Sequence, residues 1–279
     1  MRHAFLILAH KNYEQLVKFI DQLSFGEIFI HVDRKNEPLY ERLKLLQKTR
    51  GGLHVLEKRE RVNWSGLSIV KAELRLLQAA NAYGDFDYFH MMSGQDLLLV
   101  NEDGFNKWFA KMPGAQYMDV KEAGSLAWRL QVYSFFRENP KNRTVPFRLA
   151  DGLLRLVQVP FVRRKAFKGQ LIWMGSTWFS ITQDAVRWIL KVTEEKQLER
   201  VYERTACPDE HYFQMILMNS PFQAALVHDT GRYIKWGSTA SPKILTMTNY
   251  LDFMRSGCVI ARKFDSTVDE SVIEKVCEI

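Results

Sequence analysis

The stretch from residue 4 to residue 35, AFLILAHKNYEQLVKFIDQLSFGEIFIHVDRK, decides the fold. Its two apolar runs, residues 4–9 and 27–32, have the length and composition of buried strands. Between them, Asn12 is suited to cap a helix. The apolar residues that follow it recur on one helix face: Leu16, Phe19, Ile20 and Leu23. This order predicts two parallel strands joined by a crossover helix.

The same alternation continues through the first hundred residues, with helical patterns at 38–47 and 65–82 and strand candidates at 53–56 and 87–92. It predicts an α/β fold with a single doubly wound, mostly parallel sheet flanked by helices. The second half is less regular. Its expected strands lie near residues 116–120, 178–181 and 224–227, and its expected helices near 184–192, 208–218 and 246–255. Without a linker or an internal repeat, residues 1–279 are expected to form one domain with an elaborated C-terminal half.

Composition limits the class of protein. The chain has 279 residues, of which 47% are hydrophobic and 25% charged, which suits a globular domain. Its three cysteines are irregularly spaced, which favours a reducing compartment, and its first apolar run is too short for a signal peptide or a membrane span. The net charge of +7 suits an anionic ligand, an anionic membrane or nucleic acid, or it reflects a solvated basic surface.

Polar residues follow the expected parallel strands. Because ligands bind at the carboxyl ends of such strands, these residues are expected to line one ligand-binding edge. They are His10 after the first strand, His31, Asp33, Arg34 and Lys35 at the second, and Ser93, Gln95 and Asp96 after the strand that begins near Asp87.

The Asp85-Phe86-Asp87 triplet has the Asp-x-Asp spacing of many metal sites in sugar-nucleotide enzymes. It precedes its strand, however, so it is predicted to be a structural turn at the opposite edge. Asp96 lies on the ligand side but has no neighbouring carboxylate, and one carboxylate is a poor magnesium or manganese site. A lysine and an arginine could balance the charge of a nucleotide diphosphate instead.

Four other segments are candidates for chemistry, each with a structural alternative. Glu210, in TACPDEHYFQ (205–214), is either a helix-capping acid or a general base that the helix N-terminus keeps ionised. GRYIKW (231–236) and IARKFD (260–265) are either edge strands with exposed cations or a clamp on phosphate. Trp178 in GSTWF (175–179) is either buried or stacks on a sugar.

Two further segments leave similar alternatives open. In RVNWS (61–65), Ser65 is a candidate N-cap and Trp64 belongs either to the core or to a cleft. Residues 147–168, FRLADGLLRLVQVPFVRRKAFK, combine cations with apolar side chains and form either a surface helix with a basic end or a contact with an anionic membrane.

Taken in order, eight segments resemble glycosyltransferase family 14, which contains the branching β-1,6-N-acetylglucosaminyltransferases and the peptide O-xylosyltransferases. They are LAHKN (8–12), FIHVDRK (29–35), VNWSGLSIVKAEL (62–74), FHMMSGQDLLL (89–99), GSTWF (175–179), CPDEHYFQMIL (207–217), RYIKW (232–236) and ARKFD (261–265). The compact length is similar to that of a bacterial member.

The resemblance implies a GT-A type fold and an inverting, metal-independent transfer from a UDP-sugar, with a nucleotide-binding half up to about residue 100. It implies that Glu210 is the catalytic base. The residues implied for the donor are His10, Asp33, Asp96, Arg232 and Lys263, of which Arg232 and Lys263 would hold the diphosphate. Those implied for the acceptor are Trp64, Ser176 and Trp178. One departure is Thr177, where the xylosyltransferases carry Asp, which directs the role of base toward Glu210.

We therefore expect a UDP-sugar-dependent glycosyltransferase acting on a surface polysaccharide or a lipid-linked glycan. The expected donor is UDP-N-acetylglucosamine, with UDP-xylose, UDP-galactose or another hexose as alternatives. The expected location is the cytoplasm, with docking of 147–168 to the inner face of the membrane. One alternative is a metal-dependent phosphoesterase that uses His10, His31, Asp33 and Asp96 and loses activity in EDTA. Another is a nucleic-acid-binding module with strongly salt-dependent binding.

Overall fold

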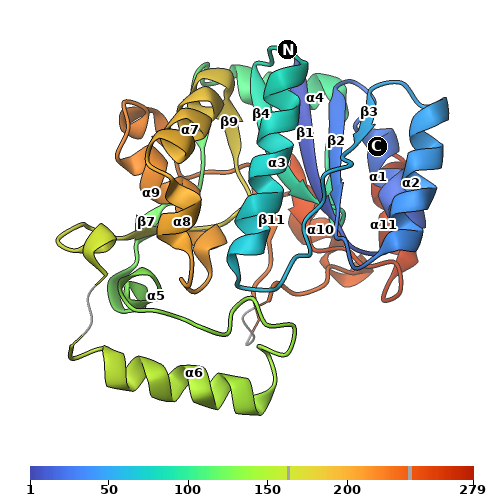
Figure 1. Ribbon diagram of the computed structural model, residues 1–279. Coiled ribbons are helices and arrows are strands. Elements are labelled where there is room, and N and C mark those ends of the chain that lie inside the picture. The colour runs from blue at the N-terminus through green and yellow to red at the C-terminus, as the bar shows by residue number, and fades with distance from the viewer. Residues whose placement is uncertain (162–163, 238–240) are drawn as a thin grey trace.

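A large, mostly parallel sheet flanked by helices forms the centre of the molecule, as the sequence predicts (Figure 1). The computed structural model describes residues 1–161, 164–237 and 241–279. Seven strands form the sheet, in the order β10 (Leu226–Val227), β6 (Gln116–Tyr117), β9 (Ser180–Thr182), β4 (Tyr88–Ser93), β1 (His3–Ala9), β2 (Glu27–Val32) and β3 (Leu53–Val55).

The parallel part of this sheet is built from the apolar runs of the first hundred residues. β1 lies between β2 and β4 and is parallel to both, and β3 continues the parallel order beyond β2. Phe5, Leu6 and Ile7 of β1 are completely buried. Both faces of this strand are therefore covered, which explains why its sequence is a continuous apolar run rather than an alternating one.

Helices cover the two faces of the sheet and enclose a separate apolar core on each side. One core contains side chains of α1 (Tyr13–Gln22), α2 (Glu37–Thr49), α4 (Glu102–Ala110), α10 (Tyr250–Met254) and α11 (Glu270–Cys277). The other contains side chains of α3 (Leu67–Tyr83), α7 (Gln183–Glu195), α8 (Leu198–Tyr202) and α9 (Tyr212–Met218).

Two smaller sheets connect distant parts of the chain. β12 (Ile260–Arg262) lies between β11 (Arg232–Ile234) and β5 (Asp96–Leu98), so the C-terminal segment returns to the first hundred residues. β7 (Lys121–Glu122) pairs with β8 (Trp173–Met174). Five short 3-10 helices complete the described elements: η1 (Gly124–Leu126), η2 (Lys165–Phe167), η3 (Pro208–Glu210), η4 (Gln223–Ala225) and η5 (Met247–Asn249).

Several predicted boundaries in the second half, and one helix cap, are wrong. The helix predicted over 208–218 is divided into η3 and α9, and the one predicted over 246–255 is divided into η5 and α10. The long helix α3 is not capped by Ser65, which has a positive φ of 62° and lies one residue too early. Gly66 occupies the N-cap position, and the amide of Ser68, the second residue of the helix, donates to Glu138 instead.

The predicted basic stretch 147–168 contains a surface helix, α6 (Val145–Gln158), none of whose residues is buried. Figure 1 shows α6 set apart from the main body, beyond the edge of the sheet where β1 ends, with the short helix α5 (Trp128–Gln131) between them. Residues 162 and 163 of the stretch lie outside the described residues. Among the described residues, none of the helices combines the length and apolar composition needed to cross a bilayer.

Candidate functional site

The carboxyl ends of the parallel strands bring the predicted donor-side residues to one edge. Ala9 of β1 pairs with Val32 of β2, so His10 and Asp33 leave the sheet side by side. Asp33 is 9% exposed, and its Oδ1 accepts hydrogen bonds from the backbone amides of Lys35 at 2.9 Å and of residue 62 at 3.4 Å. Asp33 therefore fixes the loops that border the edge, while the neighbouring His10 is exposed.

Several cations lie close together at this edge. Burial lowers the pKa of Lys263, and the positive charges of Lys11 and Arg262 lower it further. Partial burial lowers the pKa of His10, and Lys11 and Lys263 add to this effect. Positive charge is therefore concentrated at this edge, although Lys11 is paired with Asp265 and Arg262 with Asp96.

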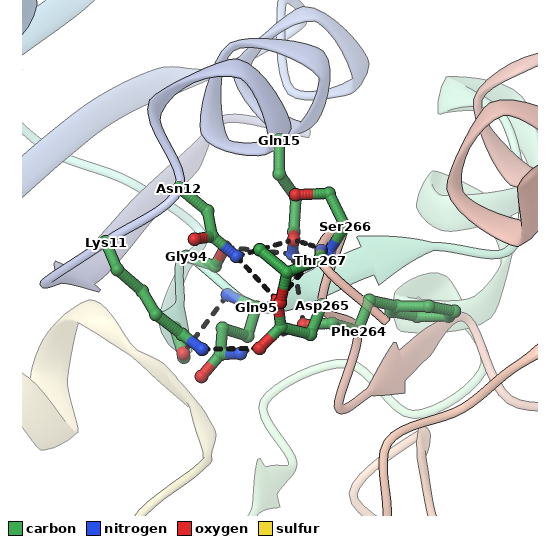
Figure 2. Close-up of polar contacts among 10 residues, drawn as sticks. Lys11, Asn12, Gln15, Gly94, Gln95, Phe264, Asp265, Ser266 and Thr267 are labelled. Atoms are coloured by element: carbon green, nitrogen blue, oxygen red, sulfur yellow. Dashed lines mark hydrogen bonds and ion pairs between the residues drawn. The ribbon is translucent and has the colours of Figure 1, made fainter. Parts of the chain in front are cut away.

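Asp265, the last residue of the ARKFD segment, joins this segment to the residues that follow β1 (Figure 2). Its carboxylate accepts from Lys11 Nζ at 2.5 Å, from Asn12 Nδ2 at 2.9 Å and from Thr267 Oγ1 at 2.8 Å. Burial opposes the ionised form, but these hydrogen bonds outweigh it and hold the pKa of Asp265 well below its usual range. Asn12 occupies the predicted N-cap position of α1, but its side chain serves Asp265 rather than the helix.

Two buried glutamines hold the backbone beside Lys263. Gln15 Nε2 and Gln95 Nε2 donate to the carbonyl oxygen of Phe264 at 3.2 Å and 3.0 Å, and the amide of Phe264 donates to the Gln95 carbonyl at 2.8 Å (Figure 2). The amide of Ser266 donates to Gln15 Oε1 at 2.9 Å. Lys263 is thus carried by a segment that is bonded both to α1, through Gln15, and to the loop after β4, through Gln95.

Asp96 is completely buried and serves as a counter-ion. Its Oδ1 lies 3.3 Å from Arg262 Nη1, and its Oδ2 accepts from the amide of Ser93 at 3.0 Å. The Arg262 guanidinium in turn lies 3.9 Å above the ring of Trp178. Trp178 is half-buried, so the predicted acceptor residue contacts the cation next to Lys263.

Arg232 and Lys263 have different environments, although both were predicted to hold the diphosphate. Arg232 is 7% exposed, and its guanidinium donates to the carbonyl oxygens of Thr230 at 2.8 Å and Phe179 at 2.8 Å and to Ser180 Oγ at 3.0 Å. Its guanidinium group is therefore a buried positive charge behind the ligand-binding edge and is not open to direct contact with a ligand. Lys263 is partly exposed and is the cation that a ligand can contact directly.

Glu210 ends the 3-10 helix η3 rather than beginning an α-helix. His211 adopts a non-helical conformation, with φ −131° and ψ −34°, and so separates η3 from α9. The expected α-helix N-terminus therefore does not include Glu210, because α9 begins two residues later, at Tyr212. The positive partner of the carboxylate is instead Arg129 of α5, whose Nη1 donates to Oε2.

The two oxygens of Glu210 differ in their surroundings. Oε2 is engaged by Arg129, whereas Oε1 has no hydrogen-bond partner among the described residues. The side chain is 38% exposed, so a ligand can reach it. A partly exposed carboxylate with one free oxygen can accept a proton from a hydroxyl group.

Two carboxyl groups lie near Glu210, one on the completely buried Glu73 and one on the half-buried Asp209. Burial, followed by the charge of Glu210, raises the pKa of Asp209 to about 7. Burial and the charge of Asp209 also raise the pKa of Glu73 well above its usual value. Thr177 Oγ1 donates to Glu73 Oε1 at 2.5 Å, so an Asp at position 177 would place another carboxylate in this cluster.

The GSTWF segment lies against Glu210. The amide of Gly175 donates to the carbonyl oxygen of Glu210 at 2.8 Å, and the amide of Ser176 donates to Asp119 Oδ2 at 3.2 Å. A Cβ atom at Gly175 would overlap the backbone carbonyl of Asp119, so this close approach requires glycine. The structure therefore brings the predicted residues Ser176 and Glu210 together.

Trp64 lies on a separate loop, whose next residue, Ser65, accepts a hydrogen bond from the amide of Cys207 at 3.0 Å. Its side chain is 51% exposed, and the guanidinium of Arg143 lies 5.1 Å from its ring centroid. The carbonyl oxygen of Trp64 accepts from Asn142 Nδ2 at 2.8 Å. An exposed, held tryptophan beside the site is suited to contact a sugar ring.

The residues of the phosphoesterase alternative do not assemble. His31 Nε2 accepts from the amide of Glu60 at 2.7 Å, and burial lowers the pKa of this histidine to about 4. Asp96 is paired with Arg262 inside the protein. Within residues 1–161, 164–237 and 241–279, no three His, Cys, Asp or Glu side chains lie close enough together to hold a metal ion.

The Asp85-Phe86-Asp87 prediction is confirmed. Both acids precede β4, at the edge opposite Asp96. Asp87 Oδ2 accepts from the amide of Arg2 at 2.7 Å, and Asp85 forms an ion pair with Arg187 at 2.6 Å. The pair therefore stabilises a turn.

The sequence model of the Core-2/I-branching enzyme family matches residues 3–252. The chain belongs to this family. It is 22% identical over 304 residues to Xylosyltransferase 2 of Mus musculus, an alignment that covers 98% of this chain and 33% of the relative. Xylosyltransferase sqv-6 of Caenorhabditis elegans is 20% identical over 300 residues, covering 96% of this chain and 35% of the relative. This branching-enzyme family chain thus spans about a third of the length of the curated relatives it matches.

Among solved structures, the branching-enzyme family chain is similar to mouse Xyloside xylosyltransferase 1 in its apo form. The sequence identity is 14% and the TM-score 0.41, with 94% of this chain and 97% of the other covered.

Three groups of this branching-enzyme family member were missed by the sequence analysis. Arg129 lies in the irregular second half, where no motif marks it, and in the sequence Glu73 and Asp209 look like ordinary helix acids. Lys11 and Asp265 were part of the quoted LAHKN and ARKFD motifs. Their positions next to two predicted donor residues were the signal that could have identified them.

Proposed function

We propose that this protein transfers a sugar from a UDP-sugar to a hydroxyl group of a glycan, with inversion at the anomeric carbon and without a divalent metal. The observation that carries the proposal is the Glu210 carboxylate, held through Oε2 by Arg129 with Oε1 left open. Membership in the Core-2/I-branching enzyme family supports the class of reaction. The sheet order and the edge it presents are consistent with a GT-A type fold.

The base and the cations lie on the same edge of the sheet. β9 is antiparallel to β4, so the GSTWF segment before β9 lies at the end of β4 that is followed by Asp96. Gly175 contacts Glu210, and Trp178 contacts Arg262, the neighbour of Lys263. A chain of contacts therefore connects the proposed base to the proposed diphosphate site.

In the proposed reaction, Glu210 Oε1 accepts the proton of the acceptor hydroxyl as its oxygen attacks the anomeric carbon of the donor. A new glycosidic bond forms on one face of the sugar while the bond to UDP breaks on the other, and the electron pair leaves with the diphosphate. Lys263 and Lys11 stabilise the negative charge that develops there, while Arg232 and Arg262 add positive potential from the interior.

The proposed donor sugar is N-acetylglucosamine, transferred to a surface polysaccharide or a lipid-linked glycan. Xylose is the second candidate, because the relatives aligned over nearly the whole chain are named xylosyltransferases. The proposed location is the cytoplasm, where three irregularly spaced cysteines would stay reduced. Trp64, Ser176 and Trp178 are proposed to contact the acceptor, and His10 and Asp33 to border the uridine.

The test of this proposal is the Glu210→Gln variant. Turnover is measured with UDP-N-acetylglucosamine, UDP-xylose and UDP-galactose in the presence of EDTA, on a panel of glycan acceptors. Because glutamine cannot accept the proton, turnover should fall by about 10²–10⁴-fold while the affinity for UDP stays near that of the wild type. The exposed Glu41→Gln variant serves as the control. Wild-type turnover in Glu210→Gln would assign the base to another residue.

A further inference from the structure

The helix α6 presents an apolar face to solvent. Its outward side chains recur at helical spacing, and their exposed fractions are 65% for Val145, 69% for Leu149, 64% for Leu153 and 67% for Leu156. Phe161, just beyond the helix, is 86% exposed. In a soluble protein such residues normally turn toward the core, so this arrangement requires an explanation.

The opposite face of α6 is held to the body by specific contacts, which fix the orientation of the apolar face. These contacts are the ring pair Phe147–Phe136 at 5.4 Å, the ion pair Asp151–Arg137 at 2.6 Å, the stacking of Arg155 over Trp128 at 4.3 Å, and the hydrogen bonds of Gln158 with the backbone amide and carbonyl of Tyr133 at 2.9 Å and 3.0 Å. The helix cannot rotate its leucines inward without breaking them.

Exposed cations occur before, within and after α6, and the one acid of the helix lies on its inner face. Lys141, Arg148, Lys165 and Lys168 are exposed and form no ion pair with any described residue. Asp151 is paired with Arg137 on the inner face. The segment therefore combines an outward apolar face with exposed positive charge that no described acid pairs with.

The segment that carries α6 is also bonded to the loop that carries Trp64. Glu138 accepts from the amide of Ser68 at 2.7 Å and from Asn63 Nδ2 at 3.2 Å, and Asn142 donates to the Trp64 carbonyl. Figure 1 shows α6 on the side of the molecule where the parallel strands end. A surface that binds α6 would therefore lie next to the proposed acceptor side of the site.

We propose that α6 docks the protein on a lipid bilayer that contains anionic headgroups. The leucine face would enter the boundary between headgroups and acyl chains, while the surrounding cations would bind the negative charges. A second copy of the chain does not fit as well, because the same cations would face one another across the interface. The benefit of docking rests on the proposed function, since it would bring the site to lipid-linked acceptors.

The test is flotation of the 279-residue chain with vesicles, without any substrate. Vesicles of phosphatidylcholine alone are compared with vesicles that also contain phosphatidylglycerol. The protein should float with the anionic vesicles at least about tenfold more than with the neutral ones, and this difference should shrink at high salt. Equal flotation with both kinds of vesicle, or none with either, would overturn the proposal.

Two double variants test whether vesicle binding depends on the apolar face of α6 or on any exposed leucines. Leu149→Gln combined with Leu153→Gln should reduce flotation by about tenfold or more, because two leucines that would be buried in the bilayer are removed. The matched control replaces Leu45 and Leu251, which are 61% and 60% exposed on other helices, by glutamine and should float like the wild type. Equal losses in both double variants would contradict a role for α6.

Two further measurements distinguish membrane docking from dimerisation and from a failure of the proposed function. Light scattering reports whether the chain dimerises, and a dimer that dissociates in the Leu149→Gln/Leu153→Gln variant would assign the face to a second copy and overturn membrane docking. UDP binding is measured by calorimetry on the same preparations. Loss of UDP binding with intact flotation would remove the proposed function and leave the docking surface, whereas the reverse result would remove only the docking surface.

Discussion

At the residue scale, Arg129 is the group that positions the Glu210 carboxylate. It is 18% exposed and reaches Glu210 from α5. An Arg129→Gln variant should lose about 10- to 100-fold in turnover, because the carboxylate is then free to rotate away from the acceptor hydroxyl. UDP affinity and the urea midpoint should change little.

Rescue distinguishes this positioning role from a structural one. Arg129→Lys restores the positive charge and should recover part of the turnover lost in Arg129→Gln, with the urea midpoint the same in both. The exposed Arg200→Gln variant is the control. If Arg129→Gln and Arg129→Lys turn over equally, the positioning role is wrong.

The sequence could identify the charged residues of the site but not their exposure. Arg232 and Lys263 occur in similar short clusters after apolar residues, yet one guanidinium is buried among carbonyl oxygens and the other cation reaches solvent. That difference depends on neighbours more than fifty residues away in the chain, such as Phe179 and Ser180. No local pattern contains this information.

At the element scale, one carboxylate joins the start of α3 to the segment before α6. Glu138 binds both the amide and the hydroxyl of Ser68, at 2.7 Å and 2.9 Å, and so replaces a local N-cap. A Glu138→Ala variant should lose about 1–2 kcal/mol of unfolding free energy in urea, because the helix amide is left without an acceptor. Glu41→Ala, on an exposed position of α2, should change it by less than about 0.5 kcal/mol. Equal effects would show that Glu138 is not the cap.

The accuracy of the predicted bounds depends on the length and burial of each element. β1, β2 and β4 lie within one residue of their predicted bounds, because buried parallel strands leave uninterrupted apolar runs. In the second half, β6, β8 and β10 contain two residues each, too few to produce a period. The cap of α3 was missed because Glu138 is distant in sequence from Ser68.

At the scale of the whole molecule, Asp209 couples stability to pH, because its Oδ1 atom is buried without a hydrogen-bond partner among the described residues. Its pKa is raised from 3.8 to about 7, first by burial, so the folded protein retains a proton that the unfolded chain releases near pH 4. Between these values the folded state binds more protons, and the stability that this group contributes falls as pH rises from about 4 to about 7.

An Asp209→Asn variant removes this dependence, because asparagine does not titrate. The unfolding free energy of Asp209→Asn minus that of the wild type should therefore increase by about 1–2 kcal/mol from pH 5 to pH 7, because only the wild type is destabilised over this range. Urea titrations at the two pH values measure it. Asp184→Asn, at an exposed position of α7, serves as the control. A constant difference between Asp209→Asn and wild type at both pH values would contradict the raised pKa.

In the proposed function the chain's own cations, and not a metal ion, bind the donor diphosphate. This is tested by calorimetric titration of UDP into the wild-type protein, the Lys263→Ala variant and a Lys196→Ala control, each in EDTA and in manganese chloride. We expect wild type and control to bind UDP with the same Kd in both buffers, and Lys263→Ala to bind about tenfold or more weakly in both. UDP binding that disappears in EDTA, or that is unchanged in Lys263→Ala, would contradict it.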